Sequence, residues 1–106
     1  MWQYSQEVNL NELLESNDAA IIFKHSNSCS ISSMALSRTL KAQEEIESKA
    51  AVYLIDVKAN RNLSLEVADH LGVRHESPQI IIIQDGKVVY DASHFNINPQ
   101  TILSYL

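Results

Sequence analysis

The sequence contains few of the residues that cross-link a small protein or interrupt its helices and strands. Its 106 residues include one cysteine, two glycines and two prolines. A single cysteine cannot form an internal disulfide, so any disulfide must join Cys29 to another molecule. A hydrophobic content of 45% is enough to build one core without disulfide or metal cross-links. Because no repeat, low-complexity tract or linker interrupts the chain, we predict a single domain over residues 1–106.

Basic residues are also scarce, and they are scattered. Eight Lys and Arg stand against thirteen Asp and Glu, which gives a net charge of −5. Such a chain offers no basic stripe for the phosphates of nucleic acid or for an anionic membrane. No segment approaches the roughly 20 apolar residues that span a bilayer, and the start of the chain lacks a signal-peptide pattern. We expect a soluble cytoplasmic protein, with neither nucleic acid nor membrane as a partner.

Helical and strand patterns alternate through the first half of the chain. In "NLNELLES", Asn9 is placed to cap a short helix. Residues 19–26, "AAIIFKHS", are apolar enough for a buried strand that ends in the Ser/Asn cluster before Cys29. A helical pattern runs from Ile31 to about Leu40, and residues 41–50 either continue this helix or form a second one.

The second half repeats the alternation. Residues 51–57, "AVYLIDV", indicate a second buried strand, and the helix that follows is predicted to end at Gly72. At the other end of this half, Asn98 and Pro99 form a typical helix start, so a short helix is expected to reach Leu106.

The clearest local pattern is a β-hairpin. The apolar run Ile80–Ile83 leads through a turn at Asp85–Gly86 into a return strand at Val88–Tyr90. The full order of elements predicts an α/β fold with a central mixed sheet, in which early strands are parallel and a C-terminal hairpin is antiparallel. Helices should cover both faces of this sheet.

These elements resemble the thioredoxin fold over nearly the whole chain. The most specific part is "IDVKANRNLSLEVADHLGVRHESPQIIIIQDGKVV", where Pro78 takes the place of the cis-proline. Within the superfamily, "FKHSNSCSIS" and "SHFNI" resemble the YtxJ-like monothiol bacilliredoxins, small bacterial proteins associated with the thiol bacillithiol. The sequence departs from the family pattern at Ser30, because in that pattern a proline directly follows the cysteine. Serine also stands at position 32, in place of the second, resolving cysteine.

Cys29 is the principal candidate for chemistry. It lies where a strand is predicted to end and a helix to begin, and the free N–H groups of a helix start stabilise a thiolate. A lone cysteine can instead be a small hydrophobic residue of the core. The polar neighbours Asn27, Ser28 and Ser30, together with the thioredoxin-like remainder of the chain, favour a nucleophile.

Other candidate site residues surround this thiol. Ser32, one turn along the helix, can donate a hydrogen bond to the sulfur or simply be solvated. His25 can add positive potential near a substrate, with Ser28 beside it, or be hydrogen-bonded in the core. The resemblance implies that Ser77, before Pro78, offers backbone groups to a substrate, although a proline at the first residue of a strand is also ordinary.

A single sulfur implies a specific reaction. Cys29 would attack a mixed disulfide between a client protein and a small thiol, release the protein, and retain the small thiol until a second thiol or a reductase frees it. The resemblance implies bacillithiol as the co-substrate and S-thiolated proteins as clients. Glutathione or coenzyme A would satisfy the same chemistry, and the sequence does not choose among the three thiols. We expect no tightly bound cofactor and no metal site. A glutaredoxin-like iron–sulfur carrier and a non-catalytic binding module remain alternatives.

Overall fold

The predicted mixed sheet is confirmed by the structure, a computed structural model that describes residues 2–106. Within these residues, four strands form one sheet in the order β2-β1-β3-β4. β2 is parallel to β1, whereas β3 and β4 are antiparallel to their neighbours. The strands are β1 (Ala20–His25), β2 (Ala51–Asp56), β3 (Gln79–Gln84) and β4 (Lys87–Ser93). Met1, the first residue of the predicted domain, lies outside the described residues.

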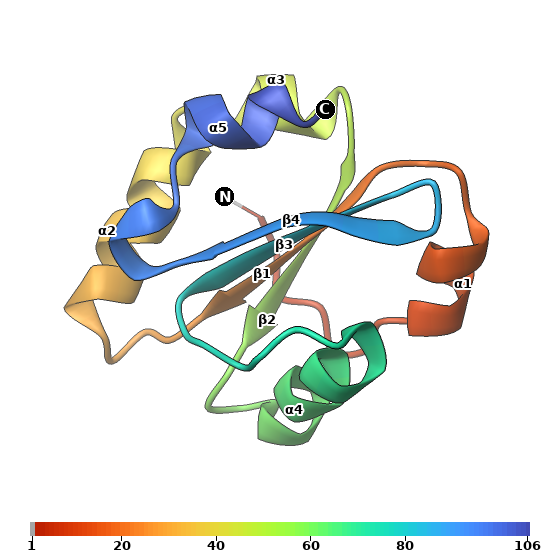
Figure 1. Cartoon of the computed structure of the whole chain (residues 1–106). Coiled ribbons are helices and arrows are strands. Elements are labelled where there is room, and N and C mark those ends of the chain that lie inside the picture. The colour runs from red at the N-terminus through yellow and green to blue at the C-terminus, as the bar shows by residue number, and fades with distance from the viewer. Residues whose placement is uncertain (1) are drawn as a thin grey trace.

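Helices cover both faces of the sheet, as Figure 1 shows. One face carries α2 (Ser30–Leu40), α3 (Gln43–Glu47) and α5 (Pro99–Ser104), and the other carries α1 (Leu10–Glu15) and α4 (Arg61–Leu71). Residues 41–50, left open by the sequence pattern, contain a separate short helix. In the described part of the chain, no helix has the length and apolarity needed to cross a membrane.

The helix ends form as their capping residues predict. The Oδ1 atom of Asn9 accepts the N–H of Glu12 at 3.1 Å, and the Oδ1 atom of Asn98 accepts the N–H of Gln100 at 2.8 Å. Gly72 ends α4 with a φ of 68°, which is the left-handed conformation that favours glycine.

The hairpin is also confirmed, with a return strand longer than predicted. Its turn residues, Asp85 and Gly86, have φ values of 52° and 73°. The register shifts between Ile82 and Ile83, so the hairpin contains a β-bulge or similar irregularity. A Cβ atom at position 86 would collide with the carbonyl oxygen of Leu14, so this turn needs glycine for space as well as for its backbone angle.

The strand predicted at residues 51–57 is less buried than expected. Ala51 is exposed, and Val52 and Tyr53 are only half-buried. β2 lies at the edge of the sheet, where its outer side has a single isolated bridge, between Tyr4 and Leu54, among the described residues. An edge position leaves part of an apolar strand accessible, which the composition of the strand alone does not reveal.

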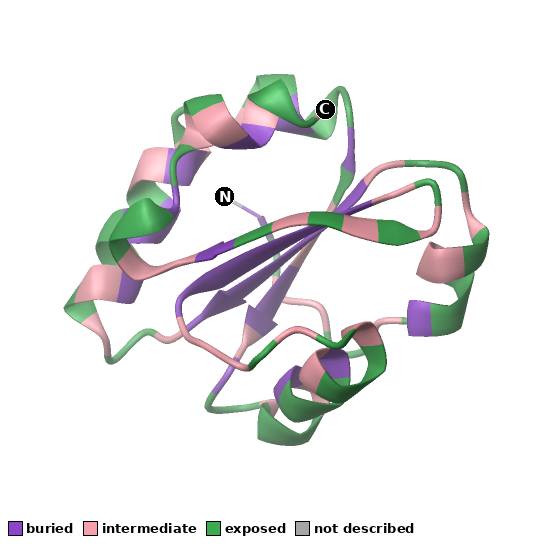
Figure 2. Cartoon of the chain, in the orientation of Figure 1, coloured by how far each residue is buried: buried purple, intermediate pink, exposed green. Residues whose placement is uncertain are grey.

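Each face of the sheet has its own apolar core. Alternate residues of β1 point to opposite faces, so Ile21 and Phe23 pack beneath α2, whereas Ile22 packs beneath α1 and α4. Figure 2 shows the central strands as the most buried part of the molecule. Three polar side chains, Lys24, His25 and Gln79, are buried in these central strands with exposed fractions of 0%, 3% and 2%.

Candidate active site

Three segments that are distant in the sequence meet at one end of the sheet. The register pairs Lys24 of β1 with Gln79 of β3, and Gln79 with Ser93 of β4. The end of β1 therefore lies beside the start of β3 and the end of β4, as can be followed in Figure 1. The loop that carries the cysteine, the loop that carries the predicted cis-proline, and the residues after β4 thus share one edge.

Cys29 is the N-cap residue of α2. Its φ of −112° and ψ of 119° are extended, and its carbonyl accepts the N–H of Ser33 at 3.1 Å. The residue is partly exposed, and its side chain forms no capping hydrogen bond among the residues described. Residues 30–33 include no Asp or Glu, so no carboxylate in the first turn opposes an anion there. The free N–H groups and the positive end of the helix dipole lie at this position.

A buried hydrogen-bond network lies behind the thiol. His25 is 3% exposed and Ser32 is 0% exposed. The Oγ atom of Ser32 lies 2.7 Å from Nδ1 of His25 and accepts the N–H of Ser26 at 2.9 Å. On the other side of the ring, Nε2 of His25 lies 3.0 Å from Oδ1 of Asn27, which also accepts the hydroxyl of Tyr4 at 3.0 Å.

The partners in this network assign its protons. An amide oxygen only accepts, so Nε2 of His25 donates to Asn27. When only this nitrogen carries a proton, Nδ1 accepts the hydroxyl of Ser32. Burial and the nearby Asp56 raise the pKa of Tyr4, which keeps its hydroxyl protonated as a donor. The backbone of the Cys29 loop is therefore fastened to β1 through Ser26 and Asn27.

This network changes the geometry expected for the site residues on α2 and β1. The hydroxyl of Ser32 is engaged with His25 rather than with the sulfur, because Ser32 is buried in the core. His25 is a hydrogen-bonded core histidine, which was one of its two expected placements. Ser28 is exposed on the loop, and its Oγ atom lies 3.2 Å from the Oγ atom of Ser26.

The Ser77–Pro78 segment lies next to the end of β1. Its peptide bond is cis, as the resemblance implied, and Pro78 is buried. The carbonyl of Pro78 accepts the N–H of His94 at 3.0 Å, which joins the proline loop to the 3-10 helix η1 (His94–Asn96). The Oγ atom of Ser77 is buried without a hydrogen-bond partner among the described residues.

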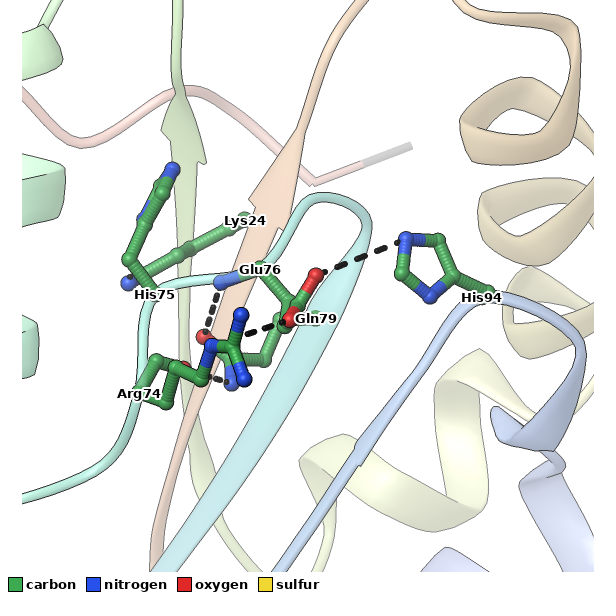
Figure 3. Close-up of polar contacts among 6 residues, drawn as sticks. All are labelled: Lys24, Arg74, His75, Glu76, Gln79 and His94. Carbon is green, nitrogen blue, oxygen red and sulfur yellow. Dashed lines mark hydrogen bonds and ion pairs between the residues drawn. The ribbon is translucent and has the colours of Figure 1, made fainter.

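Several polar residues of this edge had no role in the sequence interpretation. Glu76 lies 3.7 Å from Arg74 and 3.8 Å from His94, measured between side-chain oxygen and nitrogen atoms, and all three residues are drawn in Figure 3. The Nζ atom of Lys24 lies 3.0 Å from Nδ1 of His75. One feature of the sequence indicates a buried polar contact at this edge: Lys24 is a charged residue inside an apolar strand pattern.

The histidines and acidic residues do not gather into a metal site. Among residues 2–106, no group of three His, Cys, Asp or Glu side chains is placed to hold a metal ion. His75 contacts Lys24, and His94 contacts Glu76 instead.

Comparisons with known proteins agree with this geometry. The family model of the monothiol bacilliredoxin BrxC matches residues 3–102. A solved structure of a candidate oxidoreductase with a thioredoxin fold is 30% identical, with a TM-score of 0.76, and the match covers 89% of this chain and 82% of that one. This degree of similarity supports a thiol oxidoreductase.

More distant structures show the same fold. Desulfothioredoxin from Desulfovibrio vulgaris Hildenborough is 25% identical, with a TM-score of 0.62 and coverage of 94% of this chain and 88% of that one. A mutant thioredoxin from Halobacterium salinarum is 20% identical, with a TM-score of 0.67 and coverage of 96% and 83%.

Proposed function

Because the chain belongs to the monothiol bacilliredoxin family, we propose that it removes bacillithiol from protein mixed disulfides, with Cys29 as the nucleophile. The observation that carries this proposal is the position of Cys29: a partly exposed thiol at the N-terminus of an 11-residue helix whose first turn lacks an acidic residue. Membership of the family supports bacillithiol as the small thiol, and the position of Cys29 supports this residue as the nucleophile.

The reaction is an exchange of one disulfide for another. The Cys29 thiolate attacks the bacillithiol sulfur of the mixed disulfide, and the client cysteine leaves as a thiolate that takes a proton from water. Cys29 is then joined to bacillithiol. A second bacillithiol thiolate attacks this adduct, releases the disulfide of two bacillithiol molecules, and restores the Cys29 thiolate. In each step the attacking thiolate is oxidised to a disulfide sulfur while the leaving sulfur is reduced to a thiolate, so the exchange balances without a tightly bound cofactor.

The side chains around Cys29 have positioning roles in this proposal. Ser32 acts through His25, because its hydroxyl proton is engaged there and both residues fasten the loop before the thiol. Ser28, exposed beside Cys29, and the backbone of Ser77, before Pro78, are placed to contact the client segment. The reaction needs a reduced pool of small thiol, so we place it in the cytoplasm, with S-thiolated proteins as clients.

The test is intact-mass spectrometry of the purified protein. The protein is incubated separately with the disulfides of bacillithiol, glutathione and coenzyme A, and the rate of adduct formation is followed. We expect one bacillithiol to add to Cys29, faster than the other two thiols, and to leave when free bacillithiol is supplied. Cys29→Ser is the matched control, because it keeps the size of the side chain and removes the sulfur.

Each outcome of this experiment has a distinct meaning. If no disulfide gives an adduct, Cys29 is not the proposed nucleophile and the chain acts as a binding module. If glutathione or coenzyme A reacts faster than bacillithiol, the nucleophile is retained and the bacillithiol assignment is wrong. Visible absorbance in protein purified without oxygen would favour an iron–sulfur carrier instead.

A further inference from the structure

Two polar side chains interrupt a face that is otherwise apolar over the central strands β1 and β3. Lys24 and Gln79 are direct cross-strand neighbours, and the alternation of β1 and β3 places them on the face that packs against α4. Their apolar neighbours on this face, Ile22 and Ile81, are fully buried. Burying polar groups beside these isoleucines costs free energy unless the groups gain partners.

The partners are three consecutive residues of the loop before the cis-proline. Gln79 donates from Nε2 to the carbonyl of Arg74 at 2.8 Å and accepts the N–H of Glu76 at 3.4 Å. Between them, His75 lies with Nδ1 at 3.0 Å from Nζ of Lys24. Figure 3 shows that Lys24 and Gln79 reach this loop from the adjacent strands β1 and β3.

Protonation of this pair is set by its surroundings. Burial, followed by the charges of Lys24 and Arg61, lowers the pKa of His75 from its ordinary value of 6.5, although Glu76 acts in the opposite direction. A neutral His75 can accept at Nδ1 from the Lys24 ammonium. Among residues 2–106, Glu76 forms an ion pair with Arg74 and lies close to His94, and no ion pair includes Lys24. The contact with His75 is therefore the hydrogen bond that the structure provides for the buried amine of Lys24.

We propose that Lys24 and Gln79 are positioning residues that brace loop 74–76 against the sheet and so hold Ser77–Pro78 beside Cys29 for the client segment. This inference rests on the proposed function, because it assigns the loop to substrate binding. The residues between Gly72 and Ser77 belong to no helix or strand, and the backbone groups of Arg74 and Glu76 find their partners in the side chain of Gln79. Lys24 acts through His75 and does not touch the reacting sulfur atoms.

The test compares two substitutions at His75, a partly exposed loop residue whose replacement leaves the cores unchanged. His75→Asn keeps an acceptor close to the position of Nδ1, whereas His75→Leu removes it. The probe is a peptide whose single cysteine carries bacillithiol in a mixed disulfide. Alkylation by iodoacetamide measures the reactivity of Cys29 without a client segment.

We expect His75→Leu to lower kcat/KM for the peptide about tenfold, as loss of one hydrogen bond to a charged group does, with most of the change in KM. His75→Asn should stay within about twofold of the wild type, and alkylation should change by less than about twofold in both variants. A wild-type kcat/KM in His75→Leu would overturn the proposal, as would equal losses in both variants or a parallel loss of alkylation.

Failure of the proposed function would be recognised separately. In that case the wild-type protein would leave the peptide unchanged and form no adduct at Cys29. Amide hydrogen exchange over residues 74–77 then decides whether the brace exists. Faster exchange in His75→Leu, with wild-type exchange in His75→Asn, would support it, and equal exchange in all three proteins would overturn it.

Discussion

Replacing Lys24 with methionine should change how the stability of this protein depends on pH. Lys24 is fully buried, and burial lowers its pKa from the ordinary value of 10.5 to about 8. Below pH 8 the side chain is charged in both the folded and the unfolded chain, so the cost of burying an ammonium is present in full. Between about 8 and 10.5 the folded protein releases this proton first, so stability rises with pH.

The size of this effect follows from the same two values. A tenfold change in proton affinity corresponds to about 1.4 kcal/mol, so a pKa lowered from 10.5 to about 8 corresponds to at most about 3 kcal/mol. Methionine has a similar length and no charge, so Lys24→Met removes this cost at neutral pH. It also removes the hydrogen bond from the charged amine to His75, which is worth about 1.5 kcal/mol. Lys24→Met should therefore be about 1.5 kcal/mol more stable than the wild type at pH 7.

Urea unfolding at several pH values measures this difference, with the fluorescence of Trp2, which is 7% exposed, as the signal. The advantage of Lys24→Met should shrink as the pH rises from 7 toward 10.5, while groups common to both proteins cancel in the difference. Lys49→Met, at an exposed lysine, is the control and should match the wild type throughout. If the wild type and Lys24→Met show parallel pH dependence, Lys24 is not the buried cation described here.

Three further predictions use the same unfolding assay. Ser32→Ala removes the partner of Ser26 N–H and His25 Nδ1 and should cost about 2 kcal/mol or more, whereas exposed Ser33→Ala should have little effect; equal losses would contradict the network. Ser77→Ala removes a buried hydroxyl without a partner, so it should be neutral or stabilising by about 1 kcal/mol, and a clear loss would reveal a partner. Gly86→Ala should lower the free energy of unfolding by more than the ~1–2 kcal/mol of an alanine in the left-handed conformation, because its Cβ atom also collides with Leu14. Gly72→Ala has open space around the Cβ atom, so it should show the backbone cost alone. Equal losses in the two variants would mean that Leu14 moves aside.

The order of elements was predictable because local chemistry determines most of it. Asn9 and Asn98 cap helices, Gly72 ends one, and Asp85–Gly86 forms the turn of the hairpin, and each of these acts through its nearest neighbours in the chain. The exposure of β2 was not predictable in this way. It depends on which strand lies at the edge of the sheet, and that is decided by pairing between distant segments.

The same difference between local and long-range determinants holds for the candidate site. The place of Cys29 at the mouth of a helix follows from the pattern around it. The direction of Ser32 does not, because an i, i+3 spacing predicts a neighbour of the sulfur, whereas tertiary packing turns the hydroxyl toward His25 on β1. The contact between Lys24 and His75 joins residues 51 positions apart, and a lysine in an apolar strand indicates only that some partner must exist.

Lys24→Met also tests whether the buried Lys24 serves the stability of the fold or the geometry of loop 74–76. If Lys24 served stability alone, a variant with higher stability at pH 7 would be expected to react at least as fast as the wild type. The brace on loop 74–76 predicts the opposite combination: higher stability, slower removal of bacillithiol from a peptide, and unchanged alkylation of Cys29. A site that gives up stability for a defined geometry is a recognised trade-off in proteins. A variant that is both more stable and as fast as the wild type would show that the loop needs no brace from this residue.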